Sequence, residues 1–102
     1  MPYTHDEKEI LLQTVRDSIN YGLSYHTPMP IELSQYPKTL QQARASFVTL
    51  HLNHQLRGCI GSLQAHQPLI QDVAHNAFSA AFLDSRFYPV TPQEYELLTF
   101  DI

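Results

Sequence analysis

Apolar residues near the start of the chain recur every three or four positions, as they do along one face of a helix. The members of this stripe are Leu11, Leu12, Val15, Ile19 and Leu23. Thr4 followed by Glu7 is a capping-box pattern, in which each side chain can satisfy a free backbone amide at a helix start. Gly22 is typical of a helix end. The pattern therefore predicts a helix over about residues 6–21.

A second helical pattern begins after Gln67. Pro68 suits the first position of a helix, because a helix start leaves that amide unpaired in any case. The residues that follow form a broad apolar stripe: Leu69, Ile70, Val73, Ala74, Ala77, Phe78, Ala81 and Phe82. We expect a helix over residues 69–83 that packs on a sheet, with its alanines allowing a close approach.

The rest of the chain contains one irregular connection and two short elements. Pro28, Pro30 and Pro37 disfavour both helix and central strand over residues 24–38, so we expect an ordered surface connection there, with a short helical turn near residues 39–43. Thr91 and Glu94 repeat the capping-box pattern and predict a short helix. Residues 98–102 are typical of a strand.

Residues 47–52 and 56–60 predict a β-hairpin. Successive side chains of a strand alternate, so the first strand places Val48, Leu50 and Leu52 on one face and Phe47, Thr49 and His51 on the other. A loop with an even number of residues would bring Arg57 and Cys59 to the leucine face. We therefore expect a three-residue loop around Asn53 and His54, with Arg57 and Cys59 on the face that carries Thr49.

Together these elements predict an α+β fold, in which an antiparallel sheet with a central hairpin packs against two or three helices. The 102 residues suffice for one core and not for two, so we expect a single domain over residues 1–102. Acidic residues outnumber Lys and Arg by ten to six, so the net charge is negative and argues against nucleic-acid binding. One cysteine allows no internal disulfide, and no apolar run approaches membrane-spanning length; we expect a cytoplasmic protein without membrane contact.

The candidate chemistry is concentrated in the sequence LRGCIG at residues 56–61. Gly58 and Gly61 indicate that something approaches the backbone closely. Cys59 is the candidate nucleophile, because positive charge from Arg57 on the same strand face would lower the pKa of its thiol. No base is placed beside it by the sequence, so we favour a structural thiol that fills a small apolar site beneath a helix.

Arg57 needs a partner if it lies inside an apolar hairpin. Either Asp84 or Asp72 forms an ion pair with it, or it recognises an anion. Asn76 lies within an apolar helical pattern, where its amide must find partners, and we expect it to bind the hairpin backbone. Asp84 and Arg86 are expected to close the end of the second helix through local hydrogen bonds, and they are candidates to border a cleft.

The six histidines include His51 and His54, which are three residues apart. That spacing brings metal ligands together on a helix and not on a strand that enters a turn. We therefore expect no metal site, and nothing in the sequence indicates a cofactor.

Several segments occur in an order that resembles the AMMECR1 family: FVTL at 47–50, LRGCIG at 56–61, Asn76-Ala77, Ala80-Ala81-Phe82, Asp84, Arg86-Phe87 and Pro89-Val90. The resemblance runs from residue 11 to residue 102. It implies a compact α+β domain of undetermined biochemical activity, often linked genetically in prokaryotes to Memo-like and radical SAM proteins. Members usually continue into a smaller lobe, so we expect this chain to be a fragment or a shortened form.

Two functional hypotheses follow. We favour a noncatalytic accessory module with a Memo-like or radical SAM partner, and we also expect an exposed sheet edge to support a homodimer. The alternative is a catalytic or small-ligand domain with an anion site at Arg57 near Cys59. Its candidate ligand-binding residues are Arg57, Gly58, Cys59, Gly61, Asn76, Asp84 and Arg86.

Overall fold

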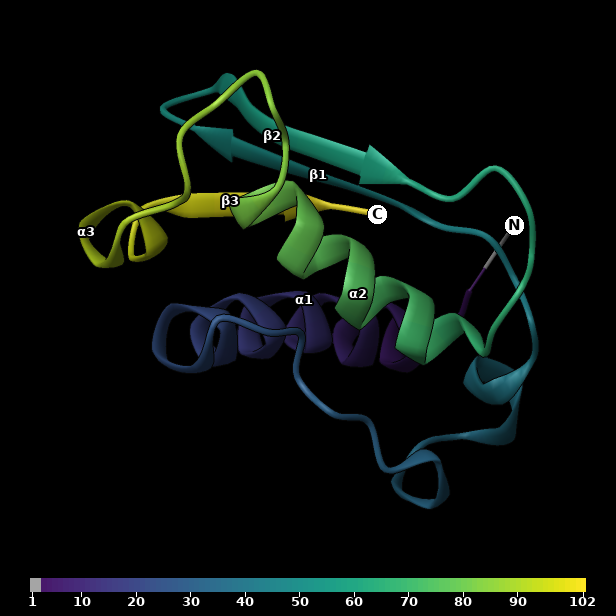
Figure 1. Ribbon diagram of the computed structural model, residues 1–102. Coiled ribbons are helices and arrows are strands. Elements are labelled where there is room, and N and C mark those ends of the chain that lie inside the picture. The colour runs from purple at the N-terminus through teal and green to yellow at the C-terminus, as the bar shows by residue number, and fades with distance from the viewer. Residues whose placement is uncertain (1–2) are drawn as a thin grey trace.

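The computed structural model describes residues 3–102 and has the α+β fold expected from the sequence (Figure 1). Its elements in chain order are α1 (His5–Tyr25), β1 (Phe47–Leu52), β2 (Gln55–Gly61), α2 (Leu69–Phe82), α3 (Pro92–Tyr95) and β3 (Leu98–Asp101). The strands form an antiparallel sheet in the order β2-β1-β3. Two 3-10 turns, Leu33–Gln35 and Lys38–Gln41, lie between α1 and β1, and the second confirms the helical turn expected near residue 39.

The two long helices form a layer on one face of the sheet (Figure 1). α2 contacts β1 and β2, while α1 lies beside α2 and contacts β3. Apolar side chains from both layers meet in one core. Its fully buried members include Leu11, Val15 and Ile19 of α1, Val48 and Leu50 of β1, and Leu69, Ile70 and Val73 of α2.

Both capping boxes are present. Thr4 and Glu7 bond reciprocally at the start of α1, and Thr91 and Glu94 do the same at the start of α3. The expected end of α1 at Gly22 is wrong, because the helix continues to Tyr25. Gly22 instead allows α2 to approach, since a Cβ at this position would lie 2.6 Å from the Phe82 ring.

The expected three-residue loop of the hairpin is also wrong. The turn has two residues, Asn53 and His54, with φ angles of 53° and 66°, and Leu52 pairs directly with Gln55. A β-bulge compensates for this even length. Leu50 pairs with Gly58 whereas the next residue of β1, His51, pairs with Leu56, so Arg57 is an extra residue without a partner on β1.

Because of the bulge, the predicted sheet face is confirmed for Cys59 and wrong for Leu56. Cys59 lies opposite Thr49, on the face that we predicted for it. Leu56 lies opposite His51 and not among the leucines, and 41% of it is exposed. The extra residue at the bulge offsets the shorter turn, so the register from Gly58 onward is the one expected for a three-residue loop. Counting residues through the loop therefore predicts the correct face for Cys59 although the predicted loop length is wrong.

Candidate functional site

Gly58 lies where α2 rests on β2. A Cβ at this position would collide with the backbone carbonyl of Ala80, so only glycine permits this separation between helix and strand. Cys59 is the next residue along the strand, and its side chain therefore faces away from the helices. The expectation that α2 shields this thiol is wrong: Cys59 is partly exposed, and its Sγ lies 3.3 Å from Thr49 Oγ1. Gly61 lies under the exposed ring of Phe47, which a Cβ would strike.

Arg57 joins β2 to α3 and to the segment that precedes α3. Its Nε and Nη2 donate to the two carboxylate oxygens of Glu94 at 3.1 and 2.9 Å, which is a bidentate ion pair. Nη2 also donates to the carbonyl of Tyr88 at 2.8 Å, and the guanidinium lies 5.7 Å from the centre of the Phe87 ring. We call this set, Arg57 with Glu94, Tyr88 and Phe87, the Arg57 clamp.

The partner expected for Arg57 was Asp84 or Asp72, and both expectations are wrong. Glu94 was identified in the sequence only as a capping residue. Its Oε1 accepts from the Thr91 amide at 3.1 Å, so the capping box holds the carboxylate that Arg57 binds. The hydrogen bonds from Arg57 hold the pKa of Glu94 below its ordinary value. The Glu94 carboxylate is therefore charged at neutral pH and ties α3 to β2.

Asp84 covers part of the free edge of β2. Its Oδ2 accepts the Cys59 amide at 3.1 Å, and Arg86 donates to the same carboxylate through Nε at 3.0 Å and Nη2 at 2.7 Å. Hydrogen bonds from Arg86 hold the pKa of the Asp84 carboxyl well below its ordinary value. The expected local hydrogen bonds between Asp84 and Arg86 are present, but the carbonyls at the end of α2 accept from the amides of Leu83 and Val90 instead. The contact with Cys59 links Asp84 to the hairpin.

A shallow pocket of about 380 Å³ opens beside the Arg57 clamp. Its lining comprises Arg57, Arg86, Phe87, Tyr88, Pro89, Thr91 and Glu94. Both arginines already pair with carboxylates. One donor remains: the buried Nη1 of Arg57 has no hydrogen-bond partner among residues 3–102.

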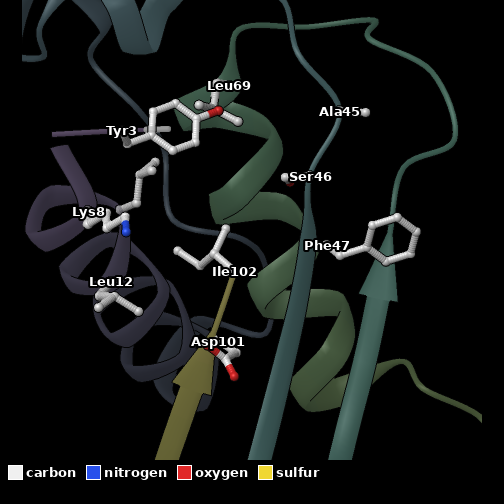
Figure 2. A pocket seen from close by; sticks show the side chains of 10 residues that line it. Tyr3, Lys8, Leu12, Ala45, Ser46, Phe47, Leu69, Asp101 and Ile102 are labelled. Carbon is white, nitrogen blue, oxygen red and sulfur yellow. The ribbon is translucent and has the colours of Figure 1, made fainter. Parts of the chain in front are cut away.

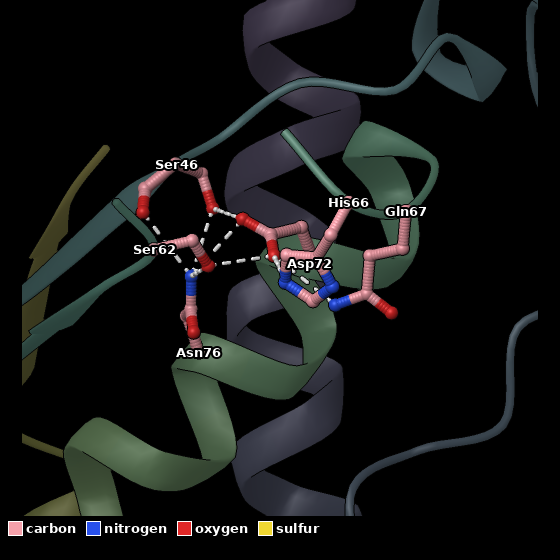
Figure 3. A network of polar contacts seen from close by, with 6 residues as sticks. All are labelled: Ser46, Ser62, His66, Gln67, Asp72 and Asn76. Carbon is pink, nitrogen blue, oxygen red and sulfur yellow. Dashed lines mark hydrogen bonds and ion pairs between the residues drawn. The ribbon is translucent and has the colours of Figure 1, made fainter. Parts of the chain in front are cut away.

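Asn76 belongs to a separate polar network, near the start of the hairpin (Figure 3). Its amide donates to the backbone carbonyl of Ser46, just before β1, which confirms the expected bond to the hairpin backbone. The centre of the network is Asp72, a fully buried carboxylate that was expected only as a partner for Arg57. Ser46 donates to Asp72 at 2.6 Å and Ser62 at 2.8 Å.

Two further groups from the loop before α2 complete this network. Gln67 donates to Asp72 at 3.1 Å, and His66 Nε2 lies 3.3 Å from the same oxygen (Figure 3). Burial raises the pKa of the Asp72 carboxyl, but the hydrogen bonds from Ser46, Gln67 and Ser62 outweigh burial and leave that pKa below its ordinary value. The network thus fastens the loop to α2 and is a structural centre.

A larger groove of about 650 Å³ lies at the other side of β1, between the first turns of α1 and the start of the strand (Figure 2). Leu11, Leu12 and Leu69 contribute apolar walls, and the side chain of Ile102 points into it. Lys8 and Asp101 provide one charge of each sign at its margin.

The predicted site residues therefore divide into two places. Arg57, Cys59, Asp84 and Arg86 come together where the end of α2 meets the hairpin, while Asn76 belongs to the Asp72 network. Within residues 3–102 no three His, Cys, Asp or Glu side chains are grouped closely enough to hold a metal ion. None of the helices described here is long and apolar enough to cross a membrane.

Comparison with known proteins assigns the chain to a family. A sequence model described as AMMECR1 matches residues 12–102. The chain belongs to the AMMECR1 family. A curated protein of Methanothermobacter thermautotrophicus is 38% identical over 97 residues, and the match covers 93% of this chain and 49% of that protein. Protein MJ0810 of Methanocaldococcus jannaschii is 36% identical over 81 residues, or 78% of this chain and 40% of MJ0810.

A solved structure of the same fold is the crystal structure of uncharacterized protein PH0010 from Pyrococcus horikoshii. It matches with a TM-score of 0.88 and 27% identity, over 95% of this chain and 50% of that one. The chain thus spans about half the length of the AMMECR1 relatives that it matches. The family match confirms the expected family, and the match to the crystal structure agrees with the expected fold. The names of these relatives state no activity.

Proposed function

We propose that this domain is a noncatalytic accessory module that acts by binding another protein. The observation that carries the proposal is the Arg57 clamp. The guanidinium is engaged by both oxygens of Glu94 and by the carbonyl of Tyr88, so the most strongly anion-binding side chain of the LRGCIG segment serves to hold the domain together. The Cys59 thiol hydrogen-bonds to Thr49 and, among residues 3–102, to no histidine or carboxylate that could act as its base.

Exposed apolar side chains around the clamp support protein binding. Leu56 precedes Arg57 and is 41% exposed, Tyr88 is 89% exposed, and Leu97, whose amide bonds to the carbonyl of Glu94, is 63% exposed. Aromatic and aliphatic groups that are exposed beside a firmly held backbone are typical of protein-binding surfaces. The family resemblance makes Memo-like and radical SAM proteins the partner classes to test first.

The test is a binding measurement with purified Memo-like and radical SAM proteins from the same genome, by biolayer interferometry. We expect saturable binding to one of them, which Tyr88→Ser weakens at least fivefold. Leu63→Ser is the matched control, because Leu63 is 94% exposed in the loop after β2, away from the clamp. Absence of binding to either class, or equal effects of the two substitutions, would contradict the proposal.

One observation favours the alternative, a small-ligand site at Arg57. The Nη1 group of Arg57 lacks an acceptor among the described residues, and the pocket beside it is large enough for a small anion. Titration with inorganic phosphate and with acetate, followed through the backbone amide NMR signals of Arg86, Phe87 and Tyr88 beside the pocket, tests this alternative. Saturable shifts at submillimolar concentration that are lost in Arg57→Lys would favour a ligand site over a partner module.

A further inference from the structure

The pocket of about 380 Å³ beside the Arg57 clamp, which we call the clamp pocket, contains two guanidinium groups whose charges are already balanced. Arg57 pairs with Glu94, and Arg86 pairs with Asp84 through two of its three guanidinium nitrogens. An anion that entered the pocket would therefore meet a carboxylate beside each cation, and like charges placed together oppose binding. Electrostatics thus favours an uncharged occupant.

Phe87 shows that both guanidinium groups can contact an aromatic ring while they bind a carboxylate. Cζ of Arg86 lies over the Phe87 ring, 5.3 Å from its centre, and Cζ of Arg57 lies over the same ring at 5.7 Å. Distances below about 6 Å are typical of cation–π contacts. A carboxylate bound to the N–H groups of an arginine is therefore compatible with aromatic contact in this pocket.

Arg86 also keeps much of its surface available to a partner. Its side chain is 56% exposed, whereas that of Arg57 is 11% exposed. Tyr88, which also lines the clamp pocket, is 89% exposed. The flat, weakly hydrated guanidinium of an arginine and the ring of a tyrosine are both surfaces on which another aromatic ring stacks. The accessible part of the pocket therefore suits an aromatic group.

We infer that the clamp pocket recognises an uncharged aromatic side chain of the partner protein, which stacks on Arg86 and Tyr88. The inference rests on the proposed function, since it names the chemistry of the partner at the same surface. The partner must then present a Phe, Tyr or Trp side chain that projects from its own surface. Aromatic side chains are enriched among the residues that contribute most to binding between proteins.

The experiment uses N-acetyl-tryptophanamide as a probe, because it carries an aromatic ring and no charge. Its titration into the labelled chain is followed through the backbone amide NMR signals of Phe87 and Tyr88, which gives a dissociation constant. N-acetyl-leucinamide is the uncharged aliphatic control. We expect saturable binding of the aromatic probe that is about fivefold tighter than that of the aliphatic one, the difference that a cation–π contact contributes at a partly exposed site.

A conservative substitution separates the flat guanidinium from its charge. Arg86→Lys keeps a cation beside Asp84 but removes the stacking surface, so it should weaken binding of the aromatic probe about fivefold. Arg44→Lys is the matched control and should leave binding unchanged, because the side chain of Arg44 bonds only to Gln42 within the described residues. Circular dichroism verifies that both variants fold.

The outcomes distinguish this inference from the proposed function. The inference is overturned if the aromatic probe binds no more tightly than the aliphatic one, if Arg86→Lys leaves its binding unchanged, or if inorganic phosphate binds more tightly at the same amides. Binding of a Memo-like or radical SAM protein that depends on Tyr88, in a chain that does not bind the probe, would overturn the inference and leave the proposed function standing. Binding of the probe, without binding of either protein class, would contradict the proposed function and leave the aromatic site standing.

Discussion

Arg57 illustrates how one side chain can determine the arrangement of several elements. It bonds to Glu94, 37 residues later in the chain, and the same carboxylate caps the start of α3. Only 11% of the Arg57 side chain and 27% of the Glu94 side chain are exposed, so water competes weakly for this pair. Bidentate pairs of this kind stabilise proteins more than ordinary surface ion pairs do.

We expect Arg57→Ala to lower the free energy of unfolding by about 2 kcal/mol, the range found for hydrogen bonds to charged groups. The substitution leaves the Glu94 carboxylate with only its capping bonds and frees the carbonyl of Tyr88. Urea unfolding at neutral pH measures the change. Arg44→Ala is the control, because the side chain of Arg44 bonds only to Gln42 within the described residues. Equal effects of the two substitutions would show that the clamp contributes no special stability.

Cys59 should react with a thiol reagent in the folded protein, because it is partly exposed on the face away from the helices. We expect the labelling rate to be independent of small additions of urea, as it is when reaction does not require unfolding. Cys59→Ser should cost at most about 0.5 kcal/mol, since the site is not a closed apolar cavity. Labelling that occurs only as the protein unfolds would instead indicate a shielded thiol.

Asp84 should make stability depend on pH under acidic conditions. The pKa of its carboxyl is lowered in the folded protein, so below about pH 5 the unfolded chain takes up a proton that the folded chain does not, and stability falls with falling pH. We expect Asp84→Asn to lose less stability than the wild type between pH 7 and pH 3, as measured by urea midpoints. Asp17→Asn, exposed on α1, is the control. If the stability of Asp84→Asn fell with falling pH as steeply as that of the wild type, Asp84 would not be the source of the pH dependence.

At the scale of elements, the contact between α2 and β2 depends on the absence of a side chain at one position. Gly58 faces backbone, the carbonyl of Ala80, which cannot move without shifting the helix. Gly61 faces the ring of Phe47, which is 55% exposed and free to rotate away. The same substitution therefore has different consequences at the two glycines.

We expect Gly58→Ala to destabilise the protein by about 3 kcal/mol or to prevent folding, as overpacking against backbone does. Gly61→Ala should cost less than about 1 kcal/mol and serves as the matched control. Thermal unfolding followed by circular dichroism measures both. Similar losses for the two variants would mean that α2 can shift away from β2 at little cost.

The sequence predicts an element correctly when the residues that determine it lie close together in the chain. The prediction fails when the deciding contact is with a residue far away in the sequence. Both capping boxes and the apolar stripe of α2 could be identified because their residues are within a few turns of each other. The sequence predicts a helix end at Gly22 because its actual partner, Phe82, is distant in sequence. Glu94 was missed as the partner of Arg57 for the same reason, since its nearby contact with Thr91 already explained it.

At the scale of the whole molecule, the two long edges of the sheet differ. The edge of β2 is covered at Cys59 by the Asp84 carboxylate. β3 is the other edge strand, and within residues 3–102 no strand pairs with its outer side. Unpaired strand edges are sites of association between chains.

We therefore expect the chain to form dimers as its concentration rises, measured by light scattering between micromolar and millimolar concentrations. Thr99→Lys should weaken the association, because lysine on an edge strand disfavours pairing with a second edge. Thr49→Lys, on the central strand, controls for added charge. A monomer over the whole range would contradict this prediction.

The turn and the bulge of the hairpin compensate for each other, and this has a consequence for insertions and deletions. A turn lengthened by one residue, combined with deletion of Arg57, would leave Gly58 under Ala80 and Cys59 opposite Thr49. Deletion of Arg57 alone would also keep this register, because Leu56 opposite His51 would then be followed directly by Gly58 opposite Leu50. A relative whose hairpin lacks the bulge would therefore keep the sheet while losing the arginine that holds α3.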